Sequence, residues 1–211
     1  MHWQSFSWLG FQIWQLPEDL QRLQEVIVTL KPDVIVETGT KHGGSSIFFA
    51  SMCRLLGKGR VISIDIHLPV EVRRAVEEGP FSDLITLIEG DSVSAEVVGR
   101  VKFLIGKDEK VFVFLDSDHS KAHVLSELYA YSDLVALGGY IVATDGIMQS
   151  LADTPLGQKK WIEDNPAAAA REFAASSPEF EIKRPTALFG EEYIVEGMTF
   201  WPDGWLKRVS A

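Results

Sequence analysis

Nearly continuous runs of apolar residues alternate with amphipathic segments over the first 145 residues of the chain. The runs are rich in Val, Ile, Leu and Phe, which is typical of β-strands that are covered on both faces. The segments between them have the length and the apolar spacing of α-helices. We therefore expect strands at 34–37, 60–66, 84–91, 111–116 and 138–145. Helices are expected at 43–56, 70–78, 92–105 and 120–137.

This alternation of strands and helices favours a parallel sheet, because each helix returns the chain to the same end of the sheet. The predicted fold class is α/β, with a doubly wound and mostly parallel sheet. Two closing strands are expected within 180–185 and 198–209, after a helix at 166–176, and the second strand is interrupted at Pro202–Gly204. The segment 147–165 has no clear period, and we interpret it as a loop or insertion.

The beginning of the sequence is unusually aromatic. Five large rings fall within fourteen residues: Trp3, Phe6, Trp8, Phe11 and Trp14. They could form a lid, contact a second subunit or simply pack on the sheet. A helix is predicted over 17–30, because proline and two acidic residues open a segment with apolar residues three to four apart. We expect one domain over 1–211, with 1–30 as an aromatic segment and helix, and 31–211 as the core.

Acidic residues mark the carboxyl ends of all five expected strands in the first part of the chain. In an open parallel sheet, ligands bind at this edge, near the point where the strand order reverses. One acidic residue at a strand end is ordinary, but five in succession would surround a single crevice. The sequence therefore predicts a site lined by Glu37, Asp65, Asp91, Asp116 and Asp145.

The composition of the chain argues against some kinds of binding partner and cellular environment. The net charge is −10, which argues against nucleic acid as the main ligand, because affinity for phosphates depends on Lys and Arg. The only cysteine is Cys53, so no disulfide can form within the chain. No apolar run approaches the roughly 18 residues of a membrane span, and the sequence does not open like a signal peptide. We expect a cytoplasmic protein that binds neither nucleic acid nor membrane.

The first loop, "ETGTKHGGSS" after the strand at 34–37, has the form of a ligand-binding turn. Neither the dinucleotide fingerprint nor the P-loop pattern is present. Glu37 would repel a pyrophosphate but suits a cationic group, while Asp65 is placed to bind a ribose and Asp91 an adenine or its ribose. These features favour S-adenosylmethionine as the ligand. The alternative is that the glycines shape a turn and bind no ligand. The predicted cofactor-binding residues are Glu37, Gly39, Thr40, Lys41, Gly43, Ser45, Asp65, His67, Asp91, Ser92 and Asp116.

Three stretches together resemble a known family: "KPDVIVETGTKHGGSSIFFASM", "ISIDI" and "LDSDHSKAHVLSELYAYSDLVALGGYIVATD". They are similar to the cephalosporin hydroxylase/rhamnosyl O-methyltransferase family, of the class I S-adenosylmethionine-dependent methyltransferase superfamily. The resemblance covers roughly residues 8 to 208. It implies a seven-stranded Rossmann-like sheet with an antiparallel C-terminal strand. It also implies methyl transfer to a hydroxyl group of a sugar or secondary-metabolite small molecule.

The wider group of metal-dependent O-methyltransferases implies a Mg²⁺ site at the same edge. Carried over to this sequence, the metal ligands fall on Asp116 and Asp145, with Asp118 as a competitor for the first position. Thr144 and Gly146 stand where that group often has a further acidic residue. A histidine three residues after the first aspartate resembles the general base of that group, which implies this role for His119.

Other interpretations stay open. His119 or Asp118 could cap the following helix and have no catalytic or metal-binding role. The family name suggests a hydroxylase or oxidoreductase, and His119, His123 and Asp116 could imitate the two histidines and carboxylate of a non-haem iron site. A cofactor-binding relative without catalysis is the third alternative. The sequence names neither the hydroxyl acceptor nor the oligomeric state, and a homo-oligomer is left open.

Overall fold

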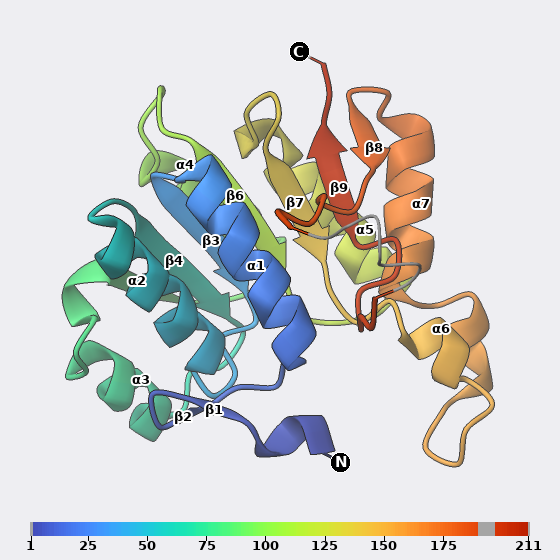
Figure 1. Ribbon diagram of the computed structural model, residues 1–211, viewed down its shortest axis with the longest axis horizontal. Coiled ribbons are helices and arrows are strands. Elements are labelled where there is room, and N and C mark those ends of the chain that lie inside the picture. Colours follow the sequence, from blue (N-terminus) through green and yellow to red (C-terminus); the bar gives the residue numbers. More distant parts are fainter. Residues whose placement is uncertain (1, 190–196, 211) are drawn as a thin grey trace.

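The structure is a computed structural model that describes residues 2–189 and 197–210, without the side chains of His2 and Trp3. Within these residues, seven strands form one sheet in the order β5-β4-β3-β6-β7-β9-β8 (Figure 1). Neighbouring strands from β5 to β7 are parallel, and β9 is antiparallel to both β7 and β8. This order confirms the doubly wound α/β sheet and its antiparallel closing strand. The strands are β3 Val34–Thr38, β4 Arg60–Asp65, β5 Ile85–Glu89, β6 Val111–Leu115, β7 Tyr140–Ala143, β8 Phe180–Ile182 and β9 Trp205–Arg208.

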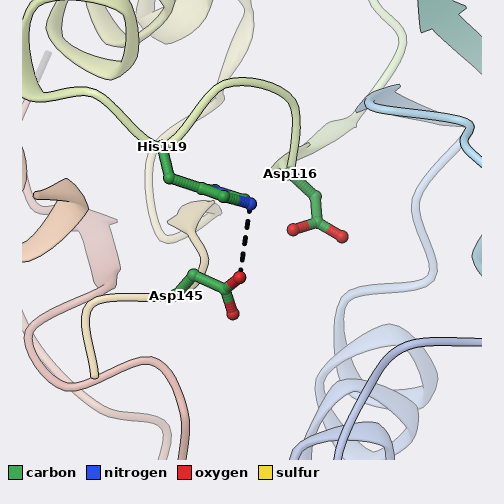
Figure 2. Close-up of side chains that lie close together, drawn as sticks. All are labelled: Asp116, His119 and Asp145. Atoms are coloured by element: carbon green, nitrogen blue, oxygen red, sulfur yellow. Dashed lines mark ion pairs between the residues drawn. The ribbon is translucent and has the colours of Figure 1, made fainter. Parts of the chain in front are cut away.

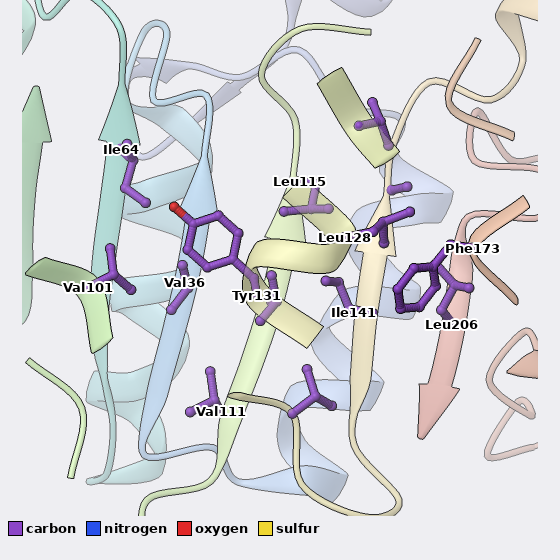
Figure 3. Close-up of a cluster of buried hydrophobic side chains, with 14 of the residues drawn as sticks. Val36, Ile64, Val101, Val111, Leu115, Leu128, Tyr131, Ile141, Phe173 and Leu206 are labelled. Carbon is purple, nitrogen blue, oxygen red and sulfur yellow. The ribbon is translucent and has the colours of Figure 1, made fainter. Parts of the chain in front are cut away.

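Helices cover both faces of the sheet, which explains why the strand sequences are apolar at successive positions. On β6, Val111, Val113 and Leu115 belong to one core, and Phe112 and Phe114 belong to the other. The first core includes side chains from α4, α5 and α7 (Figure 3), and the second includes side chains from α1 and α2. The helices are α1 Pro17–Leu30, α2 Gly44–Leu56, α3 Val70–Glu77, α4 Ala95–Phe103, α5 Lys121–Tyr131, α6 Met148–Leu151 and α7 Pro166–Ser176.

Several elements are shorter than the apolar pattern predicts. The helix expected at 120–137 ends at Tyr131 and continues only as a 3₁₀ turn, Ser132–Leu134. The helix expected from 92 begins at Ala95, because the hydroxyl of Ser94 accepts the backbone N–H of Val97. The strand predicted over 198–209 is confined to β9, since Pro202 and Gly204 interrupt it. The insertion at 147–165 contains α6 and a 3₁₀ helix, Lys159–Ile162.

The aromatic segment packs against α2, with its first short helix (His2–Ser5) followed by a hairpin of β1 (Ser7–Trp8) and β2 (Phe11–Gln12). The indole N–H of Trp8 donates to the hydroxyl of Ser51 at 3.0 Å, and its ring meets Phe48 edge-on. At Gly44 a Cβ atom would lie 2.2 Å from the carbonyl oxygen of Gln12, so only glycine allows this close approach. Residues 12–15 are thereby held over the carboxyl edge of the sheet. Among the described residues, no helix is long and apolar enough to cross a membrane.

Candidate active site

Two carboxylates and a histidine meet at the carboxyl edge of β6 and β7. Asp116 directly follows β6, and Asp145 lies just beyond β7. His119 lies in the loop between β6 and α5. Figure 2 shows the three side chains converging, and one ligand atom of each lies within 4.8 Å of the others. The Nε2 atom of His119 is 3.3 Å from Oδ2 of Asp145.

Hydrogen bonds from two directions fix the carboxylate of Asp116. The hydroxyl of Thr144 donates to Oδ1. The side-chain amide of Gln15 donates to Oδ2 at 2.7 Å, from the aromatic segment. Thr144, which takes the place of an expected acidic residue, therefore orients Asp116 rather than adding a third charge. Sequence reasoning missed Gln15, because its segment has no periodic pattern and lies 101 residues away.

The electrostatics of this pair favour a cation. Burial raises the pKa of Asp116 well above its usual range, and the nearby Asp145 raises it further. Burial also raises the pKa of Asp145, and His119 opposes that effect. Two buried carboxylates repel each other, and a cation between them would stabilise both ionised forms. Carboxylate oxygens are ligands that Mg²⁺ prefers, with water completing its coordination.

A cavity of about 730 Å³ opens beside this cluster. Its wall comes from residues 12–15, from the loop after β3, from the cluster itself, from the insertion after β7 and from Phe200. Of the predicted site residues, the ones that line it are Gly39, Thr40, Lys41, Ser45, Asp116, His119 and Asp145. The ones that do not line it are Glu37, Gly43, Asp65, His67, Asp91, Ser92 and Asp118.

The first loop lies directly against the end of β6. Gly39 has a φ of 89°, and a Cβ atom there would be 2.0 Å from the carbonyl oxygen of Asp116. A larger residue would push the loop away from the carboxylate cluster. The backbone N–H groups of Lys41 and His67 both donate to Asp65, at 2.8 and 3.1 Å. Asp65 therefore ties the first loop to the end of β4.

Glu37 lies behind this loop and is completely buried. The hydroxyls of Ser46 and Ser63 donate to its Oε2, while its Oε1 has no hydrogen-bond partner within the described part of the chain. Burial raises the pKa of Glu37, against the opposing effect of the serine hydroxyls. Its carboxyl group acts on the loop through these hydroxyls rather than from the cavity wall.

The two remaining acidic positions serve local turns. Oδ1 of Asp118 accepts the backbone N–H of Ser120 at 2.7 Å, and this bond lowers the pKa of Asp118. Asp118 therefore lies at the start of α5 and is not a member of the convergent cluster. Asp91 is exposed and accepts the N–H of Val93 at 3.1 Å.

A second buried cluster surrounds Glu127 on α5. Its Oε1 accepts the hydroxyls of Ser92 at 2.5 Å and Ser117 at 2.7 Å. His123 belongs here, with its Nε2 3.1 Å from the hydroxyl of Ser92. Sequence reasoning missed Glu127, although a glutamate on the same face as Val124, Leu128 and Tyr131 was a visible signal.

Comparisons with known proteins agree with this architecture. The family model described as Rhamnosyl O-methyltransferase/CmcI matches residues 1–209. The rhamnosyl O-methyltransferase of Mycobacterium tuberculosis (strain ATCC 25618 / H37Rv) is 30% identical over 148 residues, which are 68% of this chain and 58% of that protein. That of Mycobacterium leprae (strain TN) is 30% identical over 147 residues, 68% of this chain and 61% of the relative. The chain thus spans less than two thirds of these relatives.

Solved structures share the fold at lower identity. CmcI-N160 without ligand has a TM-score of 0.64 at 19% identity, covering 99% of this chain and 78% of that one. CmcI-D160 with Mg and S-adenosylmethionine has a TM-score of 0.62 at 19% identity, and the match covers 98% of this chain and 78% of that one. MycE methyltransferase with Mg, S-adenosylhomocysteine and mycinamycin VI has a TM-score of 0.56 at 21% identity, and the match covers 95% of this chain and 50% of that one.

Proposed function

The chain belongs to the Rhamnosyl O-methyltransferase/CmcI family, and from this we propose that it transfers a methyl group from S-adenosylmethionine to a hydroxyl group of a sugar or secondary-metabolite small molecule, assisted by Mg²⁺. The observation that carries the proposal is the convergence of Asp116, His119 and Asp145 on a cavity that also reaches the first loop. Proteins of the same fold support this proposal, since the CmcI complex contains Mg and S-adenosylmethionine and the MycE complex contains Mg and S-adenosylhomocysteine.

The cofactor would lie along the first loop. Thr40, Lys41 and Ser45 line the cavity beside Gly39, which suits the methionine part. The adenosine part would extend over the ends of β4 and β5, toward Asp65, His67, Asp91 and Ser92. Glu37 would act on the loop from behind, through the hydroxyls of Ser46 and Ser63, and Gly43 would shape the start of α2. Bound there, S-adenosylmethionine supplies an electrophilic methyl group on its sulfonium.

The metal would be held by Asp116 and Asp145, whose mutual repulsion it relieves. Asp118 stays a candidate only for contact through water, because its carboxylate is engaged at the start of α5. When bound, Mg²⁺ acts as a Lewis acid that orients the acceptor hydroxyl and lowers its pKa. Thr144 and Gln15 hold the Asp116 carboxylate in one orientation throughout.

His119 would remove the proton of the acceptor hydroxyl as its oxygen attacks the methyl group. Its Nε2 faces the cavity and lies close to both carboxylates. Asp145 accepts from this nitrogen when the imidazole is protonated and so stabilises the charge that develops on it. The cavity wall would hold the hydroxyl oxygen and the methyl group close together, which would contribute through proximity and orientation.

The hydroxylase alternative has less support. It would use two histidines and a carboxylate on one ion, but His123 contacts Ser92 and Glu127 instead of the Asp116 cluster. A non-catalytic relative is not favoured either, since a base candidate and two carboxylates line the same cavity. The cytoplasmic location and a homo-oligomeric state stay predictions from the sequence.

Calorimetry is the first test. We expect S-adenosylmethionine to bind the intact chain and NADH not to bind, and we expect Asp65→Ala to weaken the binding strongly. Mn²⁺, used as a Mg²⁺ substitute, should bind at one site, and methyl transfer to a panel of hydroxyl acceptors should stop with chelator and return with Mg²⁺. Binding of NADH in place of S-adenosylmethionine would refute the proposal.

A further inference from the structure

The cavity has a polar end and an apolar end. Asp116, His119 and the first loop form the polar end. Much of the apolar part of its wall comes from Met148 and Leu151 on α6, Leu156 and Trp161 from the insertion after β7, and Phe200. The residues expected to face adenosine lie outside the cavity, so the cofactor does not account for this apolar wall. The cavity volume of about 730 Å³ is within the range of sites for drug-sized ligands.

Charge further limits what the apolar wall can accept. Among the described residues that line the cavity, Lys41 carries the only amine, and its Nζ lies 5.4 Å from the ring centroid of Trp14 at the polar end. Neither lysine nor arginine lines the wall from Met148 to Trp161 within the described part of the chain. An anionic group there would lose its hydration without gaining an opposite charge.

We propose that the acceptor is a neutral molecule with an apolar ring system, which occupies the wall formed by Met148, Leu151, Leu156, Trp161 and Phe200 while its hydroxyl reaches His119. This inference rests on the proposed methyl transfer. It adds that the recognised part of the acceptor is apolar and uncharged, so a free hydrophilic sugar or a sugar phosphate is a poor acceptor. The ring system anchors the ligand, and the carboxylate cluster selects the hydroxyl that reacts.

A matched pair of fluorescent probes tests the chemistry of this wall. N-phenyl-1-naphthylamine is neutral, and 1-anilinonaphthalene-8-sulfonate has the same rings with one sulfonate. We expect the neutral probe to bind one site per chain, at least about tenfold more tightly than the sulfonate. Binding should persist when the protein is saturated with S-adenosylmethionine.

Two variants locate the binding. Leu156 is 67% exposed and lines the cavity, so Leu156→Asp changes the wall with little effect on the core. Leu55, on α2 and 79% exposed, does not line the cavity, and Leu55→Asp is the matched control. We expect Leu156→Asp to weaken the neutral probe about tenfold or more, as a changed apolar contact in a pocket does. Leu151→Asp should act alike, and Leu55→Asp should have no effect.

Cofactor calorimetry on the same variants separates this inference from the proposed function. Both the acceptor inference and the proposed function are supported if only Leu156→Asp and Leu151→Asp weaken binding of the neutral probe and if all variants keep their affinity for S-adenosylmethionine. Absence of neutral-probe binding, tighter binding of the sulfonate, insensitivity to both wall variants or displacement of the probe by S-adenosylmethionine overturns the acceptor inference alone. Failure of S-adenosylmethionine to bind the unmodified chain overturns the proposed function instead.

Discussion

Two carboxylates in this protein, the half-buried Asp145 and the buried Glu127, each face a histidine at almost the same distance. His119 Nε2 lies 3.3 Å from Asp145, and His123 Nε2 lies 3.4 Å from Glu127. Their surroundings differ. Asp145 faces a second carboxylate, Asp116, and both line the cavity. Glu127 is completely buried, and the hydroxyls of Ser92 and Ser117 donate to it.

The difference separates a reactive pair from a structural one. Neutral hydroxyl donors satisfy one oxygen of Glu127, and Glu127 raises the pKa of His123 by its hydrogen bond. Asp116 and Asp145 instead keep a repulsion that only a cation or a proton removes. A carboxylate–histidine pair therefore indicates chemistry only where a second charge and an open cavity accompany it. Four predictions test this distinction and the effect of burial behind it, from the largest expected effect to the smallest.

Replacement of the two histidines should separate the pairs most clearly. His119→Ala is expected to slow the chemical step by about 10²–10⁴-fold, the usual contribution of a positioned base. His123→Ala should slow it by less than about tenfold, because His123 does not line the cavity. Single-turnover methyl transfer measures the step, and calorimetry should give unchanged S-adenosylmethionine affinity for His119→Ala. Equal losses in both variants would remove the distinction between the two pairs.

Asp19 isolates the effect of burial, since neither a histidine nor a carboxylate is its hydrogen-bond partner. It is 2% exposed and accepts from the Thr199 hydroxyl at 2.6 Å and the Phe200 N–H at 2.8 Å. Burial raises its pKa to about 6, so the folded state binds this proton more tightly than the unfolded state. Its stabilising contribution is complete below about pH 4 and is lost as the pH rises through about 6.

The shift in the pKa of Asp19 corresponds to roughly 3 kcal/mol of stability. In Asp19→Asn the amide can accept from Phe200 and donate to Thr199, so both contacts remain available. We expect urea unfolding of the unmodified protein to lose stability between pH 4 and pH 7, and the variant to lose less by up to that amount. Identical pH dependence in the two proteins would show that burial does not perturb Asp19.

Asp145→Asn tests the second charge of the reactive pair. It should weaken Mn²⁺ binding by at least about tenfold, because even changes around a metal ligand reduce affinity by that much. Glu127→Gln is the control, since it alters a buried carboxylate that the proposed metal site does not include. Titration calorimetry with Mn²⁺ measures both. A loss of affinity in Glu127→Gln alone would place the ion at the other cluster.

The smallest effect is expected for the stability of Glu127→Gln. The amide oxygen can still accept from Ser92 and Ser117, and its NH₂ group replaces an oxygen that has no partner. We expect the free energy of unfolding to fall by about 1 kcal/mol, as for one weakened hydrogen bond. Glu127→Ala should be worse, because it leaves both hydroxyls without their acceptor. Chemical denaturation distinguishes the two variants, and a larger loss for the glutamine would contradict the hydroxyl network.

The strand ends were predictable because apolar runs and turn residues are local signals. The positions of Asp116 and Asp145 follow from them, since neighbouring parallel strands end at one edge. Gln15 was not predictable, because its contact with Asp116 joins residues 101 positions apart and leaves no period in the sequence. The length of α5 was overestimated, because a 3₁₀ turn follows Tyr131 while apolar residues continue in the sequence. The interruption at Pro202–Gly204 was predictable from these turn residues, and β9 begins directly after it.

The contact between Gln15 and Asp116 has a consequence for the order in which the protein is made. At typical rates of synthesis, about 5 to 20 s separate the addition of these two residues to the growing chain. Until Asp116 has been added, Gln15 has no carboxylate to which its amide can donate. The carboxylate cluster also needs Asp145, which follows β7, so it can be complete only after the five parallel strands β3 to β7 have been synthesised.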